Sequence, residues 1–172
     1  MKNWEGEEVN NKIDNRIMDS DKWPNLQLSE NLELLNELAD ESFSTQTVSG
    51  MLASTLMYHQ IIEAMCLHLL ENCHFQIQLA VSPAMIDFSI KENKMLGSYI
   101  QELKNSISFH KKDEFIKYVT NFNNIRNDLI HKMRKNNPEV IFEKTKNLKQ
   151  IFNEILNYII KNKKIVKKII GE

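Results

Sequence analysis

The sequence predicts an all-α fold, most simply an up-and-down bundle of four main helices with an extra helix at the N-terminal side. Only four glycines and three prolines occur in 172 residues, so turns are few and the elements between them are long. Apolar residues recur at helical spacing along most of the chain, and no segment shows the alternation of a half-buried strand. The length, together with 42% hydrophobic and 26% charged residues, suits one globular domain with a substantial core.

The chain divides into an N-terminal arm and one helical domain. Residues 1–24 lack a clear apolar period and end at DKWPN, so we expect a loose arm there and a single bundle domain over residues 25–172. The first helix is expected within LSENLELLNELADES, where Ser29 is placed to cap it. Its apolar residues at helical spacing are Leu28, Leu32, Leu35 and Leu38.

Four main helices are expected after this one. They cover residues 46–80, 92–108, 111–136 and 138–169. The first of them ends before Pro83, and the last begins at Pro138, a favoured first helical position with Asn137 before it. The segment VSPAMIDFSIK, residues 81–91, is expected to be a loop.

Charge is unevenly distributed along the chain, although the net charge is only −1. Residues 1–100 hold 6 basic and 15 acidic residues, whereas residues 101–172 hold 16 basic and 8 acidic ones. The basic part can attract a polyanion, or the two parts can attract each other or a second copy of the chain. The basic stretch KNKKIVKKII, residues 161–170, likewise suits either contact with RNA or anionic lipid, or a solvated helix end.

Several classes of protein are not expected. No run approaches the ~18 uninterrupted apolar residues of a membrane-spanning helix, and MKNWEGEEVNNKID lacks the apolar core of a signal peptide. Cys66 and Cys73 lie in one predicted helix and suit free thiols in a reducing cytoplasm. No zinc-ligand spacing and no glycine-rich phosphate loop occurs. We therefore expect a cytoplasmic protein that uses no metal, no other cofactor and no membrane.

Two predicted helices each carry an ionisable residue on an apolar face. On the penultimate helix, Arg126 falls inside the apolar stripe, while Asn127 and His131 lie together on its flank. That stripe comprises Phe115, Val119, Phe122, Ile125, Leu129 and Met133. On the helix expected over residues 46–80, Glu63 falls inside the apolar stripe, and His59 lies one turn earlier on the same face. This second stripe comprises Leu52, Leu56, Cys66 and Leu70.

A charge on an apolar face requires either a partner or contact with water. Glu63 and Arg126 have opposite charges, so we expect that they meet across two helices or that both line one polar pocket. A direct pair would mainly fix the register of the helices, whereas an open site would offer Arg126 to a phosphate.

The stretch RNDLIH, from Arg126 to His131, resembles the R-N-x-x-x-H motif of HEPN domains, named for higher eukaryotes and prokaryotes nucleotide-binding. YHQIIEAMCLHLLE resembles the long second helix of that family, and KMLGSYIQEL resembles the leucine-glycine segment that often precedes its motif helix. The resemblance covers about residues 45–165. It implies a helical bundle that forms a homodimer in which the motif helices face each other.

The resemblance also implies a function. Active HEPN proteins are metal-independent endoribonucleases, often toxins or antiviral effectors, whereas inactive ones are binding or dimerisation modules. We therefore expect a ribonuclease that acts on single-stranded RNA, with an antitoxin or a nucleotidyltransferase as a further partner in a toxin–antitoxin or phage-defence role. The alternatives are an inactive HEPN-like module that regulates a partner protein, and a structural helical domain in which the motif match is accidental.

The residue types of the motif suit RNA cleavage, which removes a proton from a 2′-hydroxyl and builds charge on a phosphorane. Histidine can exchange that proton near neutral pH, so His131 is expected to act as acid and base. Arg126 offers a charged guanidinium fork to phosphate, and Asn127 is expected to orient the substrate or the histidine. Glu63, with His59 one turn earlier, is expected to position Arg126. On one helix Arg126 and His131 lie about 140° apart, so two antiparallel copies would be needed to surround one phosphate.

Overall fold

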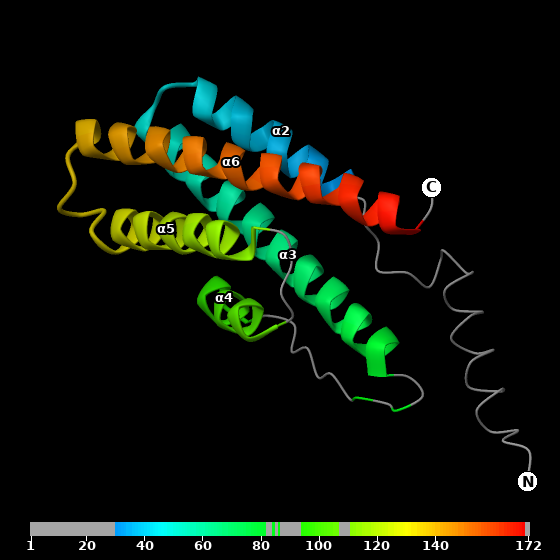
Figure 1. Ribbon diagram of the computed structural model, residues 1–172. Coiled ribbons are helices and arrows are strands. Elements are labelled where there is room, and N and C mark those ends of the chain that lie inside the picture. Colours follow the sequence, from blue (N-terminus) through cyan, green and yellow to red (C-terminus); the bar gives the residue numbers. More distant parts are fainter. Residues whose placement is uncertain (1–29, 82–83, 85, 87–93, 107–110, 171–172) are drawn as a thin grey trace, which may run out of the picture.

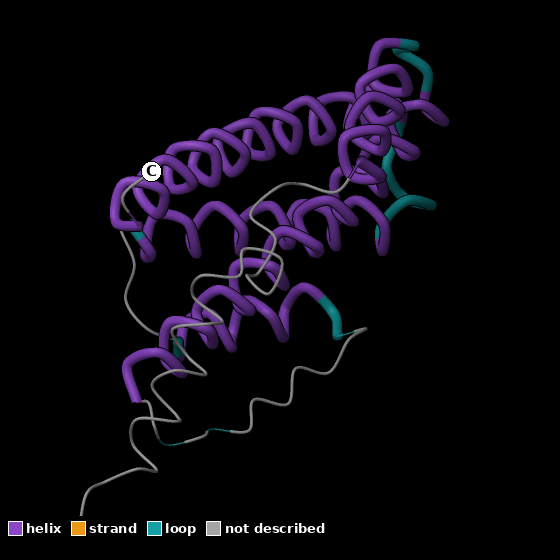
Figure 2. Tube along the Cα trace, turned by 90° about the vertical axis from the view of Figure 1, so that its right-hand side faces the viewer, coloured by secondary structure: helices purple, strands orange, loops and turns teal. Residues whose placement is uncertain are grey.

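Five α-helices make up the part of the chain that the computed structural model describes (Figure 1). That part comprises residues 30–81, 84, 86, 94–106 and 111–170. The helices are α2 (Glu30–Ser44), α3 (Val48–Val81), α4 (Leu96–Asn105), α5 (Lys112–His131) and α6 (Pro138–Ile170). Figure 2 shows these helices in purple, with no strand among the described residues. The predicted all-α fold is confirmed, while the arm predicted over residues 1–24 lies outside the described residues.

α4 is shorter than predicted. It begins at Leu96, because Met95 before it has an extended backbone, and it ends at Asn105. Ser106 closes this end, since its backbone N–H and its hydroxyl both donate to the carbonyl oxygen of Leu103, at 3.2 and 2.7 Å. The limits of α4 therefore follow from its two flanking residues rather than from apolar spacing.

α5 also ends earlier than predicted, at His131. Residues 132–135 form a turn instead of a further helical turn. Asn137 caps the next helix, because its Oδ1 accepts a hydrogen bond from the backbone N–H of Val140 at 3.0 Å. α6 then begins at Pro138, as predicted.

α3 is the centre of the bundle. It packs against each of α2, α4, α5 and α6, while α5 also packs against α4 and α6. In Figure 1, α5 and α6 form one antiparallel pair, and α2 and α3 form a second. The largest side chains of the main core are Tyr58, Tyr99, Phe115, Phe122 and Phe152. The buried aromatic rings thus come from four of the five helices.

The predicted apolar stripe of α3 is only partly correct. Cys66 and Leu70 are fully buried, but Leu52 is half-buried and Leu56 is 45% exposed. The reason is that α3 contacts helices on several sides, so its buried residues do not keep to one stripe. No helix in the described ranges combines the length and apolar character that crossing a membrane requires.

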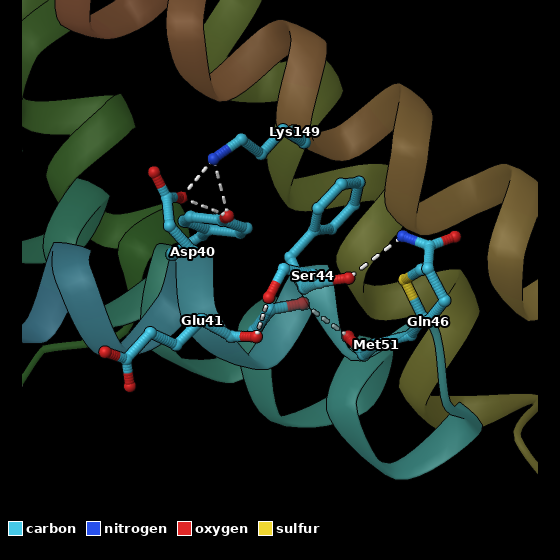
Figure 3. Close-up of polar contacts among 9 residues, drawn as sticks. Asp40, Glu41, Ser44, Gln46, Met51 and Lys149 are labelled. Atoms are coloured by element: carbon cyan, nitrogen blue, oxygen red, sulfur yellow. Dashed lines mark hydrogen bonds and ion pairs between the residues drawn. The ribbon is translucent and has the colours of Figure 1, made fainter.

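A polar contact joins α2, α3 and α6 at the edge of the core (Figure 3). Lys149 of α6 donates hydrogen bonds to the Asp40 carboxylate of α2 and, at 2.8 Å, to the Tyr58 hydroxyl of α3. Tyr58 donates in turn to Asp40 at 2.6 Å. Burial alone would raise the pKa of Asp40, but the hydrogen bonds from Lys149 and Tyr58 bring it below its usual value. One charged pair thereby connects three helices.

The first turn of α3 requires a glycine where it approaches the end of α2. Thr47 caps α3, since its hydroxyl accepts a hydrogen bond from the backbone N–H of Gly50 at 3.1 Å. A Cβ atom on Gly50 would lie 2.1 Å from the hydroxyl oxygen of Thr45 and 2.4 Å from the carbonyl oxygen of Ser42. The second of these is a backbone atom, so a side-chain rotation cannot relieve the overlap.

Gly50→Ala is expected to destabilise the protein by roughly 2 kcal/mol, because the added methyl group overlaps the backbone carbonyl oxygen of Ser42. Gly97→Ala is the matched control, since its Cβ would lie 3.9 Å from Asn123 Nδ2, an ordinary contact, and alanine favours the helix. That variant should be neutral or stabilised by up to about 1 kcal/mol. Chemical denaturation of both variants gives the free energies of unfolding, and equal values would contradict the close approach at Gly50.

Candidate functional site

The motif helix α5 is held by apolar contacts on both sides of Arg126. The stripe residues buried in the main core are Phe115, Val119 and Phe122. Leu129 is buried in a smaller cluster with Met51 of α3 and Ile141 of α6. Met133 does not belong to the stripe as predicted, because it follows the end of α5 and is 44% exposed. The buried residues fix the rotation of α5 about its axis, and this rotation sets the direction of Arg126.

Arg126 is half-buried, and its guanidinium is only partly satisfied. Its Nη1 donates a hydrogen bond to Oδ1 of the neighbouring Asn127 at 3.0 Å. Its Nε is buried and has no hydrogen-bond partner among the described residues. A buried donor without a partner is costly. Because the side chain as a whole is only half-buried, the other N–H groups of the guanidinium can bind an anion such as phosphate.

Glu63 of α3 lies near Arg126 but does not pair directly with it. Both residues belong to the described part of the chain, and no ion pair joins them there. The Glu63 carboxylate instead accepts a hydrogen bond from the backbone N–H of Leu96, the first residue of α4. Burial raises the pKa of Glu63 above its usual value, while this hydrogen bond and the charge of Arg126 oppose the rise without cancelling it. The arrangement is a shared polar environment rather than a direct pair.

His59 lies within the electrostatic influence of Arg126, and we call His59, Glu63, Arg126 and Asn127 the polar cluster. Burial, and after it the charge of Arg126, lower the pKa of His59 to about 4. His59 is therefore neutral at pH 7 and does not supply a proton there as a charged imidazolium. It adds a neutral polar group one helical turn from Glu63.

His131 lies at the end of the motif helix, beyond the residues of the polar cluster. It is the last residue of α5, is exposed to solvent, and follows Asn127 by one helical turn. Within the described ranges no hydrogen bond or ion pair engages its side chain. The structure thus gathers four of the five predicted site residues and leaves His131 at the open end of the helix.

The start of α4 belongs to the site, although sequence reasoning did not assign it there. Leu96 donates its N–H to Glu63, and the next residue, Gly97, faces α5. A Cβ on Gly97 would lie 3.9 Å from Nδ2 of Asn123, so this face of α4 lies beside α5 with room for a methyl group. In the sequence, the pair Leu96 and Gly97 was the available signal for this part of the site. The pair does not indicate which residues of other helices lie beside it.

Asp128 ties the end of the motif helix to α6. Its carboxylate forms ion pairs with Lys132 of the α5–α6 turn and with Lys144 of α6. Hydrogen bonds from Lys132 and Lys144 lower the pKa of Asp128 to about 2, so the carboxylate is charged at neutral pH. The helical spacing of the sequence indicates neither of these partners of Asp128.

The described residues contain no group of three or more histidine, cysteine, aspartate or glutamate side chains that could hold a metal ion. Cys66 and Cys73 are free and buried, and burial raises the pKa of each thiol. The chain matches no protein-family model, no curated protein and no solved structure. The function of the polar cluster must therefore be argued from its own residues and from the resemblance of RNDLIH to the HEPN motif.

Glu63→Gln and Glu63→Ala are expected to differ in stability. Glutamine keeps an oxygen that accepts the Leu96 N–H and removes a charge that burial disfavours, so the free energy of unfolding should change by less than about 0.5 kcal/mol. Alanine leaves the first N–H of α4 without its acceptor, so Glu63→Ala should cost about 1 kcal/mol. Chemical denaturation at pH 7 measures both, and equal losses would show that the hydrogen bond contributes nothing.

A double-mutant cycle of Glu63→Gln with Arg126→Met extends this measurement to the coupling between the two charges. Because both side chains are half-buried and no direct pair joins them, the coupling energy should stay below about 1 kcal/mol. A loss of ~3–5 kcal/mol from either single variant, with a much smaller loss from the double variant, would instead indicate a buried ion pair.

Proposed function

We propose that this protein is a metal-independent endoribonuclease of the HEPN type that acts on single-stranded RNA as a homodimer. The observation that supports this most directly is the half-buried Arg126, which Asn127 orients and whose Nε is unused, five residues before the exposed His131. A positioned cation and an accessible acid–base group are two elements that catalyse RNA cleavage.

In the proposed reaction the attacking group belongs to the RNA. His131 removes the proton from a 2′-hydroxyl, and the freed oxygen attacks the adjacent phosphorus. Arg126 stabilises the negative charge that develops on the phosphoryl oxygens. The bond to the 5′-oxygen of the next nucleotide breaks, and that oxygen takes a proton from a protonated histidine. The products are a 2′,3′-cyclic phosphate and a free 5′-hydroxyl, and an internal nucleophile of this kind requires no metal-bound water.

Glu63 and His59 have supporting roles in this proposal. Glu63 lies near Arg126 and accepts the first N–H of α4, so it helps to set the position of α4 beside the motif helix. His59 is neutral at pH 7 and adds no second charge beside the guanidinium. The positive charge of the polar cluster is therefore that of Arg126, which the Glu63 carboxylate partly balances.

Two copies are proposed because of the spacing of the motif on α5. Arg126 and His131 lie about 140° apart around the helix, so one copy does not direct both side chains at one phosphate. A two-fold axis between antiparallel α5 helices would bring Arg126 of one copy towards His131 of the other. Met133, which is 44% exposed beside His131, offers apolar area for such a contact.

A non-catalytic HEPN-like module that regulates a partner protein is the second candidate function. One observation favours it: no side chain in the described ranges orients His131, whereas acid–base residues of active sites are commonly held by a third group. A role as a toxin or phage-defence effector in the cytoplasm, with an antitoxin or a nucleotidyltransferase as partner, rests on the resemblance to the family alone.

His131→Ala is expected to lose at least about 100-fold of RNA cleavage, the scale of a general acid–base contribution. The fold should persist because His131 is exposed. The assay contains a chelator and monitors 2′,3′-cyclic phosphate ends, and Asn124→Ala, an exposed position on the same helix, is the control. Equal cleavage by wild type and His131→Ala would identify a contaminating nuclease. No cleavage by the wild type on varied RNAs would favour the binding module.

The wild-type protein should show about twice the 20.2 kDa chain mass in light scattering at micromolar concentration. Met133→Lys should shift the mass towards the monomer, because a further positive charge beside Lys132, Arg134 and Lys135 has no partner in an apolar contact. Met95→Lys, at a methionine that is 80% exposed before α4, is the matched control and should leave the mass unchanged. A monomer over the whole concentration range would remove the composite site and most of the support for catalysis.

A further inference from the structure

The α5–α6 connection carries an exposed run of positive charge directly after the motif. We call residues 131–135 the basic turn. All of its residues are exposed and none is acidic: His131, Lys132, Met133, Arg134 and Lys135. The proposed reaction uses only the first of them, so the three permanent cations that follow have no role in the chemical step.

Backbone hydrogen bonds give the basic turn a defined conformation. The N–H of Lys132 donates to the carbonyl oxygen of Asp128 at 3.1 Å, which closes the end of α5. The N–H groups of Lys135 and Asn136 donate to the carbonyl oxygen of Lys132 at 2.8 and 3.0 Å. Asn137 then caps α6. The cationic side chains therefore project from a backbone that is fixed at both ends by a helix.

Two cations of the basic turn have no ionic partner in the part of the chain that the structure describes. Lys132 pairs with Asp128, which also pairs with Lys144 of α6, so one carboxylate offsets part of that charge. Arg134 and Lys135 make no ion pair with any residue of the described ranges. Two adjacent uncompensated charges beside His131 create a local field that attracts a polyanion.

The opposite charge gathers on α2. Within its sequence α2 has no lysine or arginine. Its acidic residues are Glu30, Glu33, Glu37, Asp40 and Glu41. A nucleic-acid strand is thus repelled by one helix and attracted to the basic turn, so the charge distribution favours one docking position over others.

We propose that the basic turn binds the RNA phosphates next to the scissile bond, with Arg134 and Lys135 each contacting one. The inference rests on the proposed function, because His131 is the first residue of the turn and would hold the reacting nucleotide beside these cations. The ligand is a single RNA strand of several nucleotides rather than a mononucleotide. Contacts of this kind recognise the phosphate backbone and position the strand without selecting a base.

Binding without cleavage tests this inference. The probe is a labelled single-stranded RNA whose riboses all carry 2′-O-methyl groups, so that no 2′-hydroxyl can attack, and its dissociation constant is measured over a range of salt. Arg134→Ala/Lys135→Ala should reduce the slope of log affinity against log salt by about 1.4, at about 0.7 per phosphate contact. At 0.1 M salt the double variant should bind the RNA roughly 25-fold more weakly than the wild type does, if the two affinities become equal near 1 M salt.

Lys104→Ala/Lys117→Ala is the matched control, because it removes two exposed lysines near the other end of α5 and changes the net charge equally. It should keep the wild-type slope. Equal losses from both double variants would overturn the inference, since only overall charge would then matter. Absence of RNA binding by the wild type would also overturn the inference. Salt-sensitive self-association that Arg134→Ala/Lys135→Ala abolishes would overturn it as well, because the basic turn would then pair with α2 of a second copy.

The same variants separate this inference from the proposed function. Cleavage that depends on His131, with unchanged RNA binding by Arg134→Ala/Lys135→Ala, would retain the nuclease and overturn the role of the basic turn. Weaker binding by that double variant, in a protein that never cleaves RNA, would support the basic turn as an RNA-binding surface and overturn the catalytic proposal.

Discussion

The burial of α3 is the constraint on which the rest of the structure depends. α3 packs against all four other helices, so the polar side chains along it must be satisfied within the bundle. Ser54 and Thr55 achieve this locally, by donating to the carbonyl oxygen of Met51 at 2.9 and 2.8 Å. Tyr58 donates to α2, and Glu63 accepts from the start of α4. Tyr58 and Glu63 therefore serve as attachment points for α2 and α4.

The polar cluster follows from the same constraint. α4 approaches α3 where Glu63 accepts its first N–H, and α5 brings Arg126 close enough for its charge to act on Glu63 and on His59. A direct, fully buried ion pair would strengthen the register of the helices but would also hold the guanidinium away from any ligand. The observed arrangement is different, because Asn127 orients Arg126 while one of its donors stays unused.

The five helices could be predicted because apolar residues at helical spacing indicate a helix, and glycine and proline indicate where helices begin or end. The proximity of Arg126 and Glu63 could be predicted because each interrupts an apolar face. Leu56 was misplaced, since a helix that is buried on several sides has no single stripe. Met133 was misplaced because capping of α6 by Asn137 competes with continuation of α5, and spacing does not decide that competition. The hydrogen bond at the start of α4 depends on how two helices approach, which no local pattern describes.

The attachment of α2 has a consequence for the order in which the bundle opens. Among its described side chains only Ala39 is fully buried, while Leu34 and Leu38 are 55% and 43% exposed. Local opening requires least free energy where few apolar contacts are lost, so α2 can leave α3 once Leu32 and Leu35 separate from the core and the contact of Asp40 with Lys149 breaks. The pairs α3–α4, α4–α5 and α5–α6 do not involve α2. Partial unfolding would therefore begin on the acidic side of the protein and expose the Tyr58 side of the core, while the polar cluster keeps its neighbours.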